Sequence, residues 1–287
     1  MSRHVIVKPL ATRLLLALAV GAAAALAASA PAGAISGGTA DSPTAPLYPE
    51  VVAIGYPPPP DLPPEFQGTA LQRCVATLVA DTVPTGARLL TAGHCASPGE
   101  QLYVSFAADA PPTSPSWTPV INGTVVQQPG AGHDHGDPAD LGVVALPDAI
   151  VPPGITPAKL PAAGALATLR HGDLLTIVGY GCERLAQNGG PANLRCGNFT
   201  RRYTTAPFQA LRPFTLALNA NTASGAQGGA CFADSGGPVF QPDEAAPRAV
   251  RATTSGGNPL CNSVERFYRT DTPTARDFLT SHGIAVP

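Results

Sequence analysis

Three short segments of the chain carry, in order, a histidine, an aspartate and a serine whose chemistry fits together. The segments are Thr-Ala-Gly-His-Cys with His94, Asp140 followed by the apolar run 141–146, and Cys-Phe-Ala-Asp-Ser-Gly-Gly-Pro with Ser235. A serine hydroxyl attacks a carbonyl efficiently near neutral pH only when a neighbouring imidazole takes its proton. An acid that holds the imidazole in the right tautomer completes the set. The three residues therefore predict acyl transfer through a covalent serine ester.

The surroundings of these residues support this interpretation. A carboxylate at the start of an apolar strand is costly to bury unless hydrogen bonds or a partner charge compensate it, and orienting an imidazole would compensate Asp140. Asp134 and Asp137 are nearby alternatives, but no strand pattern follows either of them directly. After the serine, Gly236 and Gly237 allow the backbone to approach a substrate closely.

The elements that must position these residues are short β-strands. Runs rich in Val, Leu, Ile and Thr recur between Pro, Gly, Asn and Asp, which is typical of an all-β barrel or sandwich. The expected strands are residues 51–56, 75–80, 88–91, 101–106, 120–127, 141–146, 174–180, 214–220, 238–241, 250–255 and 266–270.

One helix is expected at the C-terminus. Asp271 or Thr272 can cap it, Pro273 suits its first turn, and Gly283 can end it. Its apolar stripe would consist of Ala275, Phe278 and Leu279.

The proline-rich segment 147–161 has little strand pattern and is the best candidate for a linker. It divides the chain into residues 35–155, which carry His94 and Asp140, and residues 156–287, which carry Ser235.

Residues 1–34 are interpreted as a cleaved secretion signal. A positively charged start precedes the apolar run 14–30, and Ala32-Gly33-Ala34 has the small-x-small form of a cleavage site. A membrane anchor is the alternative, but the apolar run has about the minimum length for a span. We expect the mature protein to be secreted and not attached to a membrane.

Charge and cysteine content narrow the possible functions further. A formal net charge of −2, without a basic run, gives no reason to expect a nucleic-acid partner. The six cysteines of an exported chain suggest disulfides, and the C-x-x-C spacing of zinc sites is absent from the sequence. We interpret His133-Asp134-His135 as part of a solvated loop, and expect no metal or cofactor.

The motifs quoted above resemble those of the chymotrypsin/trypsin-like serine protease family, and their spacing fits over essentially the whole mature chain. Ser-Gly-Gly at 255–257 is more similar to bacterial members. The resemblance implies two six-stranded antiparallel β-barrels with the active site in the cleft between them. It also implies that the chain is a serine endopeptidase that acts on polypeptides, and we expect a monomer.

The resemblance also implies roles for individual residues. His94 would be the general base and then the general acid, Asp140 would orient it, and Ser235 would form the acyl-enzyme. The backbone N–H groups of Ala233 and Ser235 would bind the oxyanion. Ser255 would lie near the buried aspartate and the substrate backbone. The implied disulfides are Cys74–Cys95, Cys231–Cys261 and Cys182–Cys196.

The sequence from Ile35 resembles the family's mature N-terminus. A freed Ile35 amine would pair with Asp234 and order the oxyanion loop and the pocket, because each buried charge needs the other. The expected signal cleavage lies directly before Ile35, so export itself would activate the enzyme. A short propeptide ending at Ala34 is the alternative.

Two residues depart from the family pattern. Ala233 replaces a near-invariant glycine, and its methyl group would restrict the oxyanion loop if φ is positive there. Gly229 stands where a trypsin-like specificity would need an aspartate, so we expect an enzyme that is not specific for Lys or Arg. Gly257 leaves the pocket open for an apolar or small residue, or for an acidic one if Arg266 points inward.

A function of a different class also remains open. A catalytically impaired pseudo-protease could act as a secreted binding module, and Ala233 is the one feature in its favour.

Overall fold

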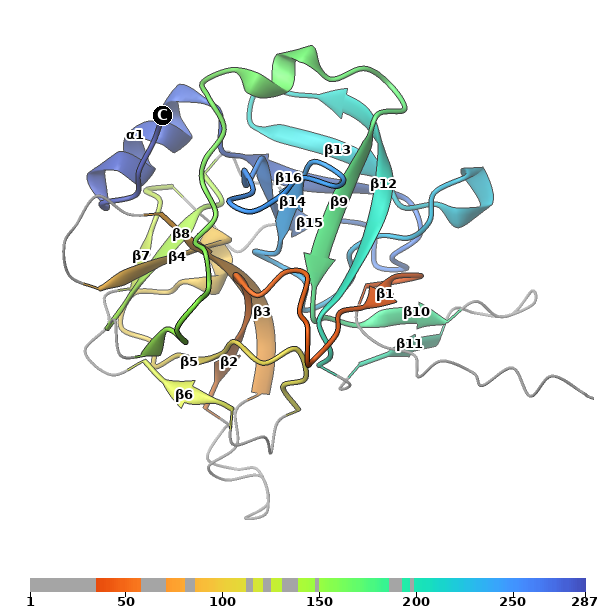
Figure 1. Cartoon of the computed structure of the whole chain (residues 1–287). Helices are drawn as coiled ribbons and strands as arrows, with labels where there is room; N and C mark the ends of the chain where they lie inside the picture. Colours follow the sequence, from red (N-terminus) through yellow and green to blue (C-terminus); the bar gives the residue numbers. More distant parts are fainter. Residues whose placement is uncertain are drawn as a thin grey trace, which may run out of the picture. The chain divides into compact units, whose positions relative to one another are not determined.

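Figure 1 shows the computed structural model, which describes residues 35–57, 71–80, 86–111, 116–120, 125–130, 139–147, 150–185, 193–196 and 199–287. The expected signal, residues 1–34, lies outside these residues. Among the described residues, no helix is both long and apolar enough to cross a membrane.

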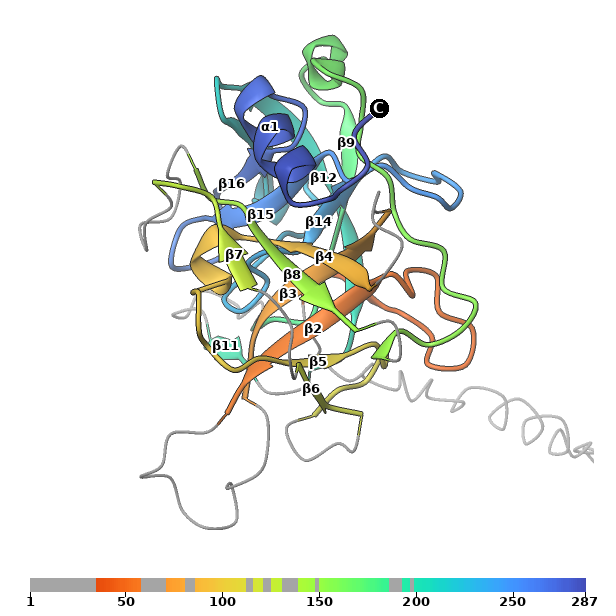
Figure 2. The same cartoon turned by 90° about the vertical axis from the view of Figure 1, so that its left-hand side faces the viewer.

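The first sheet carries the segments around His94 and Asp140. Its order is β6-β5-β2-β3-β4-β8-β7, and every pairing is antiparallel. Its strands are β2 (Val51–Tyr56), β3 (Leu71–Val79), β4 (Ala87–Thr91), β5 (Tyr103–Ser105), β6 (Thr118–Pro119), β7 (Val125–Gln127) and β8 (Gly142–Leu146). Figure 2 shows this curled sheet facing the viewer. Buried apolar side chains of its strands form one core cluster.

The second sheet closes on itself. Its order is β1-β12-β13-β16-β15-β14-β9, and β12 also pairs with β9, which makes a closed barrel of six strands with β1 at its edge. Its strands are β1 (Thr39–Ala40), β9 (Leu174–Gly179), β12 (Arg202–Leu211), β13 (Thr215–Asn219), β14 (Pro238–Phe240), β15 (Ala252–Gly256) and β16 (Val264–Arg269). A separate hairpin consists of β10 (Glu183–Leu185) and β11 (Asn193–Arg195).

The expected all-β fold with a C-terminal helix is confirmed. The closed C-terminal barrel has the expected form, whereas the N-terminal sheet is a curled half-barrel: among the described strands, its edges β6 and β7 are not paired with each other.

The longest described strand, β12, was not expected from the sequence. Residues in β12 alternate between buried and partly buried, but the strand contains Pro207, and a proline inside a run argues against a strand. Pro207 is tolerated because it pairs with Leu174, the first residue of β9, at the end of that ladder.

The C-terminal helix α1 (Pro273–Ser281) has the expected capping and buried face. The Thr272 hydroxyl accepts a hydrogen bond from the Ala275 N–H at 3.3 Å, and Pro273 lies in the first turn. Ala275, Phe278 and Leu279 are buried in a core cluster that also contains Leu90 and Leu141 of the N-terminal half.

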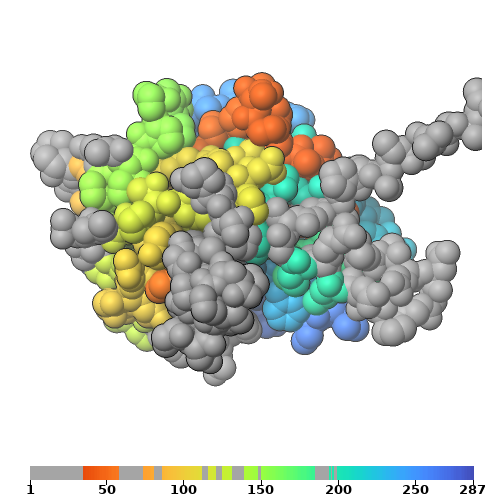
Figure 3. All heavy atoms as spheres, turned by 90° about the horizontal axis from the view of Figure 1, so that it is seen from below, coloured from red at the N-terminus to blue at the C-terminus, as the bar shows by residue number. Residues whose placement is uncertain are grey.

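The two halves are joined by a buried cation. Arg201 is fully buried, and its Nε donates to Asp41 at 2.7 Å while Nη1 donates to the Val51 carbonyl at 2.8 Å and the Tyr180 hydroxyl at 2.9 Å. The neighbouring backbone continues the contact, since the Arg201 N–H donates to Ala108 at 2.6 Å. In Figure 3 the yellow segment that contains Ala108 adjoins the cyan-green segment near residue 200.

Candidate active site

The backbone of Ser235 is held by both sheets. Its carbonyl accepts a hydrogen bond from the Val75 N–H of β3 at 2.8 Å, and the next residue, Gly236, donates to the Thr254 carbonyl of β15 at 2.7 Å. Gly236 has a φ of 82°, and a Cβ there would lie 2.1 Å from the Thr91 hydroxyl oxygen. Only glycine fits this position, so the serine is fixed at the junction of the two halves.

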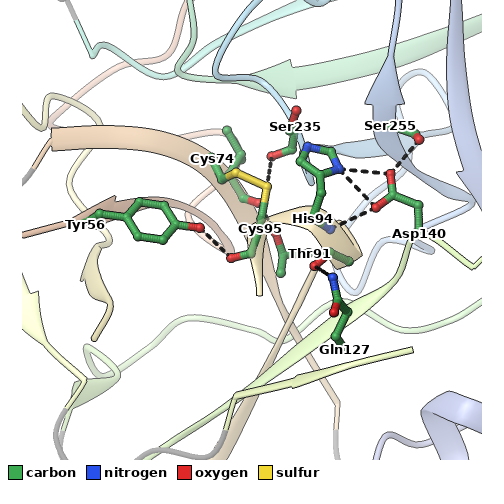
Figure 4. Close-up of a disulfide and its surroundings, with 11 residues drawn as sticks. Tyr56, Cys74, Thr91, His94, Cys95, Gln127, Asp140, Ser235 and Ser255 are labelled. Atoms are coloured by element: carbon green, nitrogen blue, oxygen red, sulfur yellow. Dashed lines mark hydrogen bonds and ion pairs between the residues drawn. A yellow bond between two sulfur atoms is a disulfide. The ribbon is translucent and has the colours of Figure 1, made fainter. Parts of the chain in front are cut away.

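His94 lies in a short 3₁₀ turn (Gly93–Cys95) that follows β4. The disulfide Cys74–Cys95 ties this turn to β3, and the Gln127 side chain donates to the Gly93 carbonyl at 2.8 Å. The Tyr56 hydroxyl donates to the Cys95 carbonyl at 2.8 Å (Figure 4). These contacts fix the backbone on both sides of the imidazole.

Asp140 is buried directly behind His94. Its Oδ1 accepts hydrogen bonds from the His94 backbone N–H and from Nδ1, both at 3.0 Å, and its Oδ2 accepts one from the Ser255 hydroxyl at 2.5 Å. Figure 4 shows the imidazole lying between Ser235 and Asp140. Because Nδ1 donates to the carboxylate, the lone pair remains on Nε2, the nitrogen that a general base uses.

The charge of Asp140 is stabilised by these donors. Burial alone would raise the pKa of Asp140, but the hydrogen bonds from His94 and Ser255 outweigh it and hold the pKa below its ordinary value. Asp140 therefore stays ionised at neutral pH.

A single cavity reaches both catalytic candidates. Cys74 and His94 line it from the N-terminal half, and Ser235 from the C-terminal half. The remaining lining residues are Ala230, Cys231, Phe232, Ala233, Thr254, Gly256, Gly257, Asn258, Pro259, Cys261 and Glu265. The site thus lies in a cleft between the two halves, as the resemblance implied.

Ala233 has the positive φ that a glycine would favour. Its φ is 67°, a left-handed conformation that costs an L-residue roughly 1–2 kcal/mol. The Phe232 carbonyl accepts a hydrogen bond from the Cys182 N–H at 2.7 Å. Because a trans peptide holds its C=O and N–H on opposite sides, the Ala233 N–H is directed away from Cys182.

Asp234 is fully buried and hydrogen-bonded to backbone groups. The Gly181 N–H donates to its Oδ1 at 2.7 Å and the Cys231 N–H to its Oδ2 at 2.8 Å. Burial nevertheless raises the pKa of Asp234 to about 7. Among the described residues, no basic side chain forms an ion pair with this carboxyl.

Ile35 is buried next to this carboxyl. A Cβ on Gly179 would contact both the Asp234 carboxyl and the Cδ1 of Ile35, so the two side chains flank the same glycine. The following residue, Ser36, forms a two-way backbone bridge with Gly229, with N···O distances of 3.0 and 3.1 Å.

The three expected disulfides are present. Cys74–Cys95 adjoins His94, Cys231–Cys261 joins the serine loop to the wall of the cavity, and Cys182–Cys196 lies at the β10–β11 hairpin. The first pair and His94 lie close enough to resemble a metal-ligand cluster, but the two sulfurs are bonded to each other and offer no thiolate.

Sequence reasoning missed one residue of the cavity, Glu265. The neighbouring Arg266 is exposed, so it does not supply the cation that would favour an acidic substrate residue. Glu265 lies two residues before the apolar Phe267, so both lie on the same buried face of β16, and this spacing is the signal that could have placed Glu265 inside.

Comparisons with solved structures show the same fold. An atomic-resolution structure of HBP matches with a TM-score of 0.60 and 17% identity, covering 88% of this chain and 99% of that one. Human heparin binding protein matches at 0.58 and 20% identity (86% and 96% covered), and HL collagenase at 0.59 and 15% (88% and 98%). No curated protein sequence matches the chain. The trypsin family model matches residues 72–278, and the chain therefore belongs to the trypsin family.

Proposed function

We propose that the protein is a secreted serine endopeptidase in which Ser235, His94 and Asp140 form the catalytic triad. The observation that carries this proposal is the buried Asp140 carboxylate, which accepts hydrogen bonds from both the Nδ1 and the backbone N–H of His94. A purely structural acid would not need to face an imidazole that lines the same cavity as a serine. Orienting a general base explains both features.

The first half of the reaction forms an acyl-enzyme. The Ser235 oxygen bonds to the carbonyl carbon of the scissile peptide while His94 Nε2 takes the hydroxyl proton. The oxygen of the tetrahedral intermediate is bound by the backbone N–H groups of Ala233 and Ser235. Collapse of the intermediate breaks the C–N bond, and the imidazolium gives its proton to the leaving amine.

Water completes the reaction by the same route. His94 takes a proton from the water as its oxygen attacks the ester carbon, and the Ser235 oxygen leaves with that proton. Asp140 stays ionised throughout and stabilises the imidazolium in each half. The hydrogen bond from Ser255 keeps the carboxylate directed at His94.

The activation proposal concerns the amine of Ile35. Cleavage before Ile35 would create an ammonium group beside Asp234, whose carboxyl accepts hydrogen bonds from the backbone N–H groups of Gly181 and Cys231 in the uncut chain. An ion pair there would fix Asp234 and, with it, the orientation of the next residue, Ser235. Export and signal removal would then be sufficient for activation.

A secreted location is supported by the three disulfides, which persist in oxidising compartments. A secreted binding module without catalysis is the second candidate, and the left-handed backbone of Ala233 is the observation that favours it.

Covalent labelling distinguishes the two candidates. A biotinylated fluorophosphonate should label the chain that begins at Ile35, and the labelled peptide should contain Ser235. The Ser235→Ala variant should not be labelled, while Ser281→Ala, which changes an exposed serine in the helix, should be labelled like the wild type. No labelling of the correctly processed protein would support the binding module.

A further inference from the structure

The cavity contains a buried carboxyl that the catalytic mechanism does not use. Glu265 lies on β16 and is 2% exposed, and it lines the same cavity as His94 and Ser235. Apart from His94, it is the one titratable side chain among the described residues of the lining. A buried acid is rare unless a partner compensates its charge.

The described residues provide a hydrogen-bond partner for only one oxygen of this carboxyl. Its Oε2 accepts a hydrogen bond from the Ala230 N–H at 2.8 Å. Its Oε1 is shielded from solvent and has no hydrogen-bond partner among the described residues. A buried polar atom without a partner costs free energy, which indicates a place for a donor that the protein itself does not supply.

The surrounding glycines give the carboxyl its space. A Cβ on Gly257 would lie 3.1 Å from the Cγ of Glu265. A Cβ on Gly229 would lie 2.7 Å from Oε1 and 2.3 Å from the Cβ of Ala220. Any side chain at position 229 would therefore collide with the carboxyl or with Ala220.

This collision gives a different explanation for the absence of an aspartate at position 229. The lack of an aspartate at position 229 led us to expect an enzyme without preference for Lys or Arg. An aspartate at 229 would collide with the Cβ of Ala220 and would also require the Glu265 carboxyl to move, so Ala220 and Glu265 fill the space that it would need. The chain thus has a carboxyl next to this position, supplied from a different strand.

We propose that Glu265 is the specificity-determining residue of the cavity and binds the cationic side chain of a Lys or Arg that precedes the scissile bond. The proposal rests on the proposed protease function. The ammonium or guanidinium group would donate to Oε1, the oxygen that lacks a partner, and would neutralise a charge that is otherwise costly to bury.

The same contact makes the preference depend on pH. Burial raises the pKa of Glu265 well above its ordinary value, and the nearby Asp234 raises it further. The neighbouring strands place no cation opposite Glu265 that would lower its pKa. On β13 its partner is Leu218, and on β15 the residue paired with the adjacent Arg266 is Gly256. A cation in the cavity favours the ionised carboxyl, so its binding releases a proton and strengthens as the pH rises.

The test measures kcat/KM for peptide nitroanilides that differ only in the residue before the scissile bond: Lys, Arg, Leu, Ala and Glu. The wild-type enzyme, processed at Ile35, should prefer Lys and Arg to Leu and Ala by at least about tenfold at pH 8, with a smaller ratio at pH 6. Glu265→Gln keeps the shape and the acceptor for Ala230 but removes the charge. It should lower kcat/KM for Lys and Arg by about 10²-fold and so abolish their advantage.

Arg266→Gln is the matched control, because this neighbour points to the opposite face of β16. It should leave the ratio of Lys to Leu substrates unchanged. Fluorophosphonate labelling separates this proposal from the proposed function: without labelling of the wild type, the protease assignment itself fails. A labelled wild type that prefers Leu, Ala or Glu would overturn the role of Glu265 even if the Gln variant did not fold. Retention of the basic preference in a folded Glu265→Gln would overturn it as well.

Discussion

Asp140 and Asp234 are both almost completely buried near Ser235, yet their environments shift their pKa values in opposite directions. Asp140 accepts hydrogen bonds from an imidazole and a hydroxyl, and its pKa is lowered. Burial raises the pKa of Asp234 to about 7, because it outweighs the hydrogen bonds that the carboxyl accepts from backbone groups. Burial alone therefore does not decide the charge of a carboxyl, because the partners decide it.

The comparison indicates which half of the site is complete in the uncut chain. The acid–base pair of the N-terminal half has its hydrogen bonds in place. The carboxyls of the C-terminal half, Asp234 and Glu265, are buried without a cation among the described residues. We infer that each is completed by an added positive charge: the Ile35 amine for Asp234 and the substrate side chain for Glu265.

The largest effect is expected when Asp140 loses its charge, since the hydrogen bonds of this acid are complete in the uncut chain. Asp140→Asn should lower kcat by about 10⁴-fold, because the amide would hold His94 in the wrong tautomer. Steady-state kinetics on a peptide substrate would measure this, with thermal unfolding to verify the fold. Asp173→Asn, which alters an exposed carboxyl, is the control and should leave kcat unchanged. A loss below tenfold for Asp140→Asn would show that Asp140 is not the orienting acid.

The second-largest effect is expected when Asp234 is left without the Ile35 amine as its partner. One extra residue before Ile35 should lower kcat/KM by about 10²–10³-fold, because an unpaired buried carboxyl costs about 3–5 kcal/mol. Active enzyme with a sequenced, extended N-terminus would contradict the activation proposal.

The pH dependence of stability sharpens the same comparison. In the uncut chain the raised pKa of Asp234 stabilises the fold at low pH, and this contribution disappears as the pH rises from about 4 to 7. The loss should amount to about 4 kcal/mol at neutral pH. Urea unfolding from pH 4 to 8 should show this decline in the uncut chain and a smaller one after cleavage at Ile35. Asp234→Asn in the uncut chain should also flatten the profile, and an unchanged slope would exclude Asp234 as its source.

The smallest effect is expected for Ala233, whose backbone is in the strained left-handed conformation. Ala233→Gly should raise the free energy of unfolding by up to about 1 kcal/mol, because relief of the left-handed strain exceeds the added entropy of the unfolded chain. It should also raise kcat several-fold if the strain displaces the oxyanion N–H. Ala226→Gly, where φ is not positive, should instead destabilise the protein. A less stable and slower Ala233→Gly would show that alanine is well accommodated there.

The sequence predicted the parts of the molecule that depend on local patterns. The capped helix α1 and most strands were expected because turn residues and apolar runs lie next to each other in the chain. The strand β12 was missed because Pro207 interrupts its pattern and its pairing with β9 is not visible locally.

Long-range contacts account for the other omissions. Nothing in the sequence around Arg201 indicates that it is buried. Its role in joining the two halves depends on Asp41 and Val51, which are far away in the chain. Glu265 was missed because the significance of Gly229 depends on a side chain from another strand. The family resemblance indicated position 229 as the place for an acid, but it did not indicate that an acid on another strand, such as Glu265, could lie next to this position.

The strand β1 and the helix α1 each pack against the half to which they do not belong. Thr39 of β1 pairs with Tyr203 in the C-terminal barrel, while Phe278 and Ile284 enter a core shared with Leu90 of the N-terminal sheet. During synthesis the N-terminal sheet emerges first, and the core that contains Leu90 is complete only when Phe278 and Ile284 have also been synthesised. An export pathway that delivers the chain from its N-terminus would therefore keep the site unassembled until translocation is complete.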